Sequence, residues 1–119
     1  MGSLTENNSL DRMAEIATPH TALVAATQDA ATVVLKDYHR HHTLVIEVVA
    51  TSGGAAHTPD AGTMVITHTS SGAALAGTLD LTDQAIVVTF DAQLDSITLT
   101  PSDLDADCSW KASYYGSPS

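Results

Sequence analysis

The run Thr43-Leu44-Val45-Ile46-Glu47-Val48-Val49-Ala50-Thr51 decides the fold, because it alternates with a period of two and is rich in β-branched residues. One face of this run is wholly apolar and consists of Leu44, Ile46, Val48 and Ala50. The opposite face is only half polar, with Val45 and Val49 on either side of Glu47. The pattern therefore predicts a central strand whose second face also offers apolar surface.

The same alternation continues on both sides of this run, in short segments separated by turn residues. The expected strands occupy residues 21–27, 32–37, 63–69, 75–81, 86–91, 97–101 and 108–115. With the central run they make seven or eight strands, which is typical of an antiparallel β-sandwich or a small jelly-roll-like barrel. We therefore predict an all-β fold. The three strands between residues 63 and 91 are expected to form an antiparallel meander, and Trp110 is the best single candidate for the core.

Residues 1–19 differ from the rest and are interpreted as an N-terminal arm before a single sandwich domain at 20–119. Four apolar residues in this arm have helical spacing and would form one stripe: Leu10, Met13, Ala14 and Ala17. A helix there would end at Thr18-Pro19. A helix this short is marginal in water, so ordering it needs a surface to dock on. We expect these four residues to bind a partner protein.

The core that this composition can build is modest. Of the 119 residues 44% are hydrophobic, but only 4% are aromatic, so Val, Ile, Leu and Ala must fill the interior. Small side chains bury less area each, and an oligomer that buries further apolar surface would add stability. We therefore expect a homo-oligomer, with a trimer as the expected state, in which Val45 and Val49 contact the neighbouring subunit.

The charge balance excludes two classes of partner. Four basic residues stand against fourteen acidic ones, and the formal net charge is -10. Such a chain cannot neutralise a row of phosphates, and it repels nucleic acid and anionic membranes alike. No apolar run approaches the length needed to cross a bilayer. We expect a protein that contacts neither nucleic acid nor membrane.

The histidines form the most conspicuous local feature. An extended chain through residues 37–42 would place Asp37, His39 and His41 on one face, and these are ligand types that zinc accepts. Arg40 would put a positive charge close to such a cation, and the set of ligands for a tetrahedral site is incomplete. We therefore expect no bound metal there. His68 is expected at the rim of the core, and His20 and His57 in loops.

The acidic segment 103–107 resembles the start of a calcium-binding loop. The resemblance fails at Cys108, where that loop needs glycine, and at Tyr114, where it needs a bidentate glutamate. A solvated acidic turn before the last strand is expected instead.

Motifs for catalysis are missing from the sequence. It contains no Gly-x-Ser-x-Gly elbow, no phosphate-binding glycine loop and no His-Glu-x-x-His. Cys108 begins an apolar strand face, a setting that raises the pKa of a thiol instead of activating it. We expect a protein without enzymatic activity and without a cofactor.

Five short runs of the sequence resemble those of a known class of protein. They are Thr21-Ala22-Leu23-Val24-Ala25-Ala26-Thr27, Val33-Val34-Leu35, Thr43-Leu44-Val45-Ile46-Glu47-Val48, Phe90-Asp91-Ala92 and Ile97-Thr98-Leu99-Thr100-Pro101. In strand rhythm, Ala and Thr richness and low charge, residues 20 to 116 resemble the small all-β structural proteins of tailed bacteriophages. The resemblance implies a virion component, foremost a head decoration or cement protein that binds the major capsid protein on the outer surface of the assembled head.

Two alternatives stay open from the sequence. Within the virion, the chain could instead belong to the tail, the collar or a fibre. In a different class, an adhesin-like β-sandwich would bind carbohydrate through exposed aromatic side chains, for which the chain offers Tyr38, Tyr114, Tyr115 and Trp110.

Overall fold

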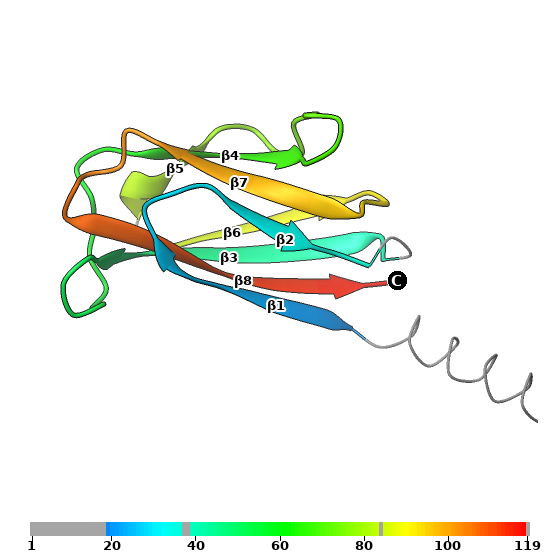
Figure 1. Ribbon diagram of the computed structural model, residues 1–119, viewed down its shortest axis with the longest axis horizontal. Helices are drawn as coiled ribbons and strands as arrows, with labels where there is room; N and C mark the ends of the chain where they lie inside the picture. The colour runs from blue at the N-terminus through cyan, green and yellow to red at the C-terminus, as the bar shows by residue number, and fades with distance from the viewer. Residues whose placement is uncertain (1–18, 37–38, 84, 119) are drawn as a thin grey trace, which may run out of the picture.

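The computed structural model describes residues 19–36, 39–83 and 85–118, which form an antiparallel β-sandwich of two four-stranded sheets (Figure 1). The elements are β1 (His20–Thr27), β2 (Ala31–Val34), β3 (His41–Ala50), β4 (Thr63–His68), β5 (Leu79–Asp80), the 3-10 turn η1 (Leu81–Asp83), β6 (Ala85–Asp91), β7 (Ser96–Ser102) and β8 (Cys108–Ser117). One sheet has the order β1-β8-β3-β6 and the other β2-β7-β4-β5. The predicted all-β sandwich is confirmed.

The predicted arm cannot be compared with the structure. Its partner-binding residues Leu10, Met13, Ala14 and Ala17 all lie outside the described residues, as does the expected helix. The division into an arm and a sandwich domain at residue 20 stays a prediction.

Strand β3 lies inside its sheet, as the alternation predicts. It pairs along its whole length with β8 on one side, and from His41 to Glu47 with β6 on the other. The side chains of Leu44 and Ile46 on its inner face are completely buried. A strand paired on both sides leaves only its two faces for contact, so β3 sets the position of the core and of the outer surface.

The core lies between the two sheets and is mainly aliphatic. Trp110 is completely buried, which confirms its predicted place, and its indole Nε1 donates a hydrogen bond to the Asp29 carbonyl at 3.0 Å. This bond satisfies the one polar atom of the ring, so burying it costs little. The other large, fully buried side chains include Tyr114, Leu44, Ile46, Met64, Ile66, Leu81, Ile97 and Leu99.

The expected meander between residues 63 and 91 is wrong. Strand β4 pairs with β5 and β7, whereas β6 lies in the opposite sheet beside β3. The 3-10 turn η1, with its buried Leu81, lies between β5 in one sheet and β6 in the other. Alternation reports which side chains face the core, and in a sandwich two strands of opposite sheets face the same core. It therefore does not reveal which sheet a strand joins.

A buried polar contact closes one end of the sandwich. His42 is 1% exposed, and its Nε2 lies 2.7 Å from the Ala92 carbonyl, an acceptor that places the ring proton on Nε2. Nδ1 then accepts a hydrogen bond from the Tyr114 hydroxyl at 2.6 Å. Gly116, the register partner of His42, leaves room for that hydroxyl, since an added Cβ would overlap Tyr114.

We predict that Gly116→Ala lowers the free energy of unfolding by roughly 1–3 kcal/mol, because the new methyl group displaces the Tyr114 hydroxyl in a packed interior. Gly77→Ala is the matched control, since a Cβ at Gly77 meets no atom within 4 Å. Urea unfolding of both variants checks this. Equal stabilities of the two variants would contradict the packing described here.

Candidate functional site

The outer surface of the β1-β8-β3-β6 sheet carries a row of small and apolar side chains. Val45 on β3 pairs with Val87 on β6 and with Ser113 on β8. Ser113 in turn pairs with Leu23 on β1. Paired residues point to the same side of a sheet, so these four side chains form one continuous row across all four strands.

A second row lies beside the first, and its centre is Thr43. It pairs with Tyr115 and Thr89, and Tyr115 pairs with Thr21. We call the two rows together the uncharged face, which consists of Thr21, Leu23, Thr43, Val45, Val87, Thr89, Ser113 and Tyr115. Three of its large side chains are open to solvent, Leu23 at 82%, Val87 at 67% and Tyr115 at 50% exposure.

An ion pair and a histidine–aspartate pair limit the uncharged face at its two ends. Toward one end, Lys111 Nζ lies 3.9 Å from Glu47 Oε2, and these two residues are register partners. Toward the other end, His41 Nδ1 lies 2.8 Å from Asp91 Oδ1. None of the eight residues of this face carries a charge, although the formal net charge of the chain is -10. Exposed apolar surface with a polar rim is typical of contacts between proteins.

Of the two β3 residues predicted to contact a partner, only Val45 remains available. It is half-buried and central in the uncharged face. Val49 was expected to be exposed, and this is wrong, since only 3% of it is exposed. The chain turns at Gly53 and Gly54, both at positive φ, and returns so that Ala56 forms a bridge with Val49. The protein's own loop therefore lies beside this position, as an added neighbour of β3.

The face expected for Asp37, His39 and His41 does not form among the described residues. The backbone N–H of His39 donates to the Lys36 carbonyl, and β3 begins only at His41, so His39 and His41 do not share one strand. His39 is completely buried, whereas His41 is exposed and paired with Asp91. Asp37 lies outside the described residues. The structure thus separates the two described members of this candidate ligand set.

A shallow depression at the start of β3 is lined by Arg40, His41, Asp91, Ala92 and Gln93. These lining residues include a histidine-carboxylate pair but no serine, threonine or cysteine. A general base with no nucleophile to activate does not make the arrangement that covalent catalysis requires. The described lining residues of the depression therefore supply no nucleophile of these three types.

His68 lies at the rim of the core, as predicted. Its Nδ1 is 2.8 Å from the Ser71 hydroxyl and its Nε2 is 2.8 Å from Asp95 Oδ1. The hydrogen bond from His68 is the main reason why the pKa of Asp95 is lowered. Both ring nitrogens make hydrogen bonds, so His68 links the end of β4 to the loop before β7.

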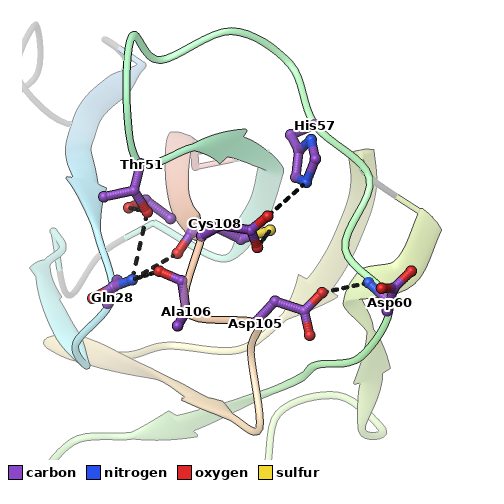
Figure 2. Close-up of polar contacts among 9 residues, drawn as sticks. Gln28, Thr51, His57, Asp60, Asp105, Ala106 and Cys108 are labelled. Atoms are coloured by element: carbon purple, nitrogen blue, oxygen red, sulfur yellow. Dashed lines mark hydrogen bonds and ion pairs between the residues drawn. The ribbon is translucent and has the colours of Figure 1, made fainter.

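The opposite end of the sandwich gathers polar groups from three loops (Figure 2). The side-chain amide of Gln28 donates to the carbonyls of Ala106 and Cys108, at 2.7 and 3.1 Å. The Asp60 N–H donates to Asp105 Oδ2 at 2.6 Å. The acidic turn expected at 103–107 therefore binds neighbouring loops as well as solvent.

Cys108 is buried, as predicted, and lies within this cluster. Burial, followed by the hydrogen bond to Asp107, raises the pKa of its thiol to about 11. His57, expected only in a loop, has its Nε2 3.4 Å from Asp107 Oδ2. Sequence reasoning missed this contact because the two residues are far apart in the chain and share no motif spacing.

Within the described residues, no helix is long and apolar enough to span a membrane.

The described residues form a small all-β sandwich, and one of its two sheets carries the uncharged face. No protein-family model and no curated protein matches the chain. Among solved structures, a mitogen derived from Yersinia pseudotuberculosis is 10% identical over 84% of each chain, with a TM-score of 0.44. A protein of the disulfide-linked pili that form Bacillus endospore appendages is 17% identical over 86% of this chain and 85% of that one, with a TM-score of 0.42. A CBM4 protein is 13% identical over 81% and 77%, with a TM-score of 0.37. Values this low carry no inference about function.

We predict that stability falls as the pH drops below about 6.5, in part through His42. Burial is the main reason why the pKa of His42 is lowered in the folded state, so the unfolded chain binds this proton more readily. The contribution is complete above the unfolded pKa and is lost as the pH falls below it. Urea unfolding at about pH 8 and about pH 5.5 measures the loss.

The control variant is His42→Gln, which removes the titrating group and leaves the His41–Asp91 and His68–Asp95 pairs in place. Its loss of stability over the same pH interval should be smaller than that of the unmodified protein. An equal or larger loss would show that His42 is not the group responsible.

Proposed function

We propose that this chain is a non-catalytic structural protein of a bacteriophage virion, a decoration or cement protein that binds the outer surface of the assembled capsid. The uncharged face carries the proposal. Leu23, Val87 and Tyr115 on it remain open to solvent in the single chain. Covering apolar surface is favourable by about 25 cal/mol per Å², so a protein neighbour that covers this face gains free energy from it.

The charge of the chain supports an outside position. With four basic and fourteen acidic residues, the protein is repelled by packaged DNA. Contact with another protein through the uncharged face adds no such electrostatic repulsion, because none of its eight residues is charged. The major capsid protein and further copies of this chain are the proposed partners. A tail, collar or fibre position would use the same face.

The arrangement of side chains supports a binding role over catalysis. The depression at Arg40 and His41 has no nucleophile among its lining residues, and the thiol of Cys108 is held protonated by its raised pKa of about 11. Neither group is prepared to attack a substrate.

The carbohydrate-binding alternative has little aromatic surface to use. Of the four aromatic residues considered for it, Trp110 and Tyr114 are buried in the core and Tyr115 is half exposed. Tyr38 lies outside the described residues. A sugar-binding platform on the described surface would therefore rest on Tyr115. A glycan array that gives specific binding, lost in Tyr115→Ala, would favour this class over the virion proposal.

We predict that Val45→Asp weakens self-association and particle binding at least about tenfold, because it places a charge in the middle of the uncharged face. Thr67→Asp is the matched control, since Thr67 lies half-buried on β4 in the other sheet. Light scattering at tens of micromolar and co-sedimentation with stripped particles provide the two readouts. Equal effects of the two variants would exclude this face as the interface.

We further predict that the arm takes part in the contact. Deleting residues 1–17 removes the stripe of Leu10, Met13, Ala14 and Ala17, and it should leave the β-sheet spectrum and melting temperature nearly unchanged. Occupancy on stripped particles should fall sharply. A lowered melting temperature would show instead that the arm packs on its own sandwich, and unchanged occupancy would remove the arm from the interface.

A further inference from the structure

Three side chains of metal-ligand type converge at the end of the sandwich that is opposite the His42 contact. Nitrogen of His57, carboxylate oxygen of Asp107 and sulfur of Cys108 all lie within 4.8 Å of one another. His57 Nε2 is 3.4 Å from Asp107 Oδ2, and Cys108 Sγ is 3.4 Å from Asp107 Oδ1. In Figure 2 the imidazole of His57 points down from one loop toward the start of β8, where the sulfur lies.

The backbone brings His57 to this place. After β3 the chain turns at Gly53 and Gly54 and runs back along the strand, with Ala50 N–H bound to the Ala55 carbonyl and His57 N–H to the Val48 carbonyl. Ala56 pairs with Val49 on the outer side of the sheet. Because successive residues alternate sides, His57 points to the inner side.

The start of β8 brings the other two ligands. Cys108 pairs with Ala50 of β3, and its side chain is completely buried on the inner side of the sheet. Its N–H donates to the Asp105 carbonyl, and its carbonyl accepts from Gln28, so the backbone here is fixed on both sides. Asp107 precedes it and is 72% exposed, which leaves its carboxylate free to adjust.

We propose that His57, Asp107 and Cys108 bind one zinc ion. An imidazole, a carboxylate and a thiolate are all ligands that zinc accepts, and the mixture of nitrogen and sulfur excludes calcium and magnesium as the preferred ion. Three protein ligands leave the fourth tetrahedral position to a water molecule. Atoms at these mutual distances need only small side-chain shifts to reach zinc bond lengths of about 2.0–2.3 Å.

The charges balance when zinc binds. The S–H bond of Cys108 breaks, its proton passes to solvent, and a zinc–sulfur bond forms. His57 contributes the lone pair of a neutral ring. One thiolate and one carboxylate then neutralise the two charges of the ion. The site joins the β3–β4 loop to the start of β8, so the bound metal links two segments that are remote in sequence.

Cobalt(II) is the probe for this site, because it takes the same tetrahedral ligands as zinc and is coloured. Titration of the full chain with cobalt should give one equivalent of binding, with a near-ultraviolet thiolate-to-cobalt charge-transfer band and visible bands of tetrahedral geometry. Added zinc should remove these bands. Zinc should also raise the melting temperature, and a chelator should reverse the rise.

Three variants locate the site. Cys108→Ser should abolish the charge-transfer band, and His57→Gln should weaken cobalt binding by about tenfold or more. Asp107→Asn, at an exposed side chain whose change leaves the fold intact, should also weaken it. The matched control is His68→Gln, which breaks a histidine–aspartate pair that lacks a cysteine and should bind cobalt as the unmodified chain does.

Two results would overturn the proposal. One is the absence of a charge-transfer band in the unmodified, reduced protein. The other is an unchanged affinity for cobalt in both His57→Gln and Asp107→Asn, with the charge-transfer band still present. That result would show that Cys108 binds metal with other partners. Neither result depends on the proposed role in the virion, because particles take no part in the experiment.

Discussion

The pairing of β3 with β8 is the constraint on which the rest of the structure depends. Every residue from His41 to Ala50 has a partner between Ser117 and Cys108, in the middle of a four-stranded sheet. A shift of one residue would exchange the two faces of β3, placing Val45 in the core and Ile46 outside. The same register sets His42 beside Gly116 at one end and Ala50 beside Cys108 at the other.

The two surfaces proposed for function follow from this register. On the outside, β6 adds Val87 and β1 adds Leu23 to a row centred on Val45. On the inside, Cys108 of β8 pairs with Ala50 at the end of β3, and the loop that returns along β3 brings His57 close to its buried thiol. Assembly and metal binding would thus use opposite sides of one sheet, and neither needs a change in the other.

The sequence predicts those features that depend on alternation alone: most of the strands, the core position of Trp110 and the outward position of Val45. The strand expected at residues 75–81 is wrong, because only Leu79–Asp80 is a strand there and Leu81 begins a 3-10 turn. The sequence does not predict what depends on how the chain crosses between sheets. The meander fails because β6 joins the sheet of β3. Val49 is buried, and the loop after the two glycines returns beside it. The prediction for the histidines assumed one extended strand through residues 37–42, but β3 begins only at His41 and leaves His39 outside it. The ligands His57 and Cys108 meet only in three dimensions, so no spacing in the sequence reveals them.

The claim that the uncharged face meets another protein is tested most directly by a cryo-electron-microscopy reconstruction of virions that carry this chain. The account predicts density for the sandwich on the outer capsid surface, with Leu23, Val45 and Val87 in contact with a neighbouring protein subunit. A well-ordered sandwich whose uncharged face points into solvent, with contacts made only by the β2-β7-β4-β5 sheet, would contradict it.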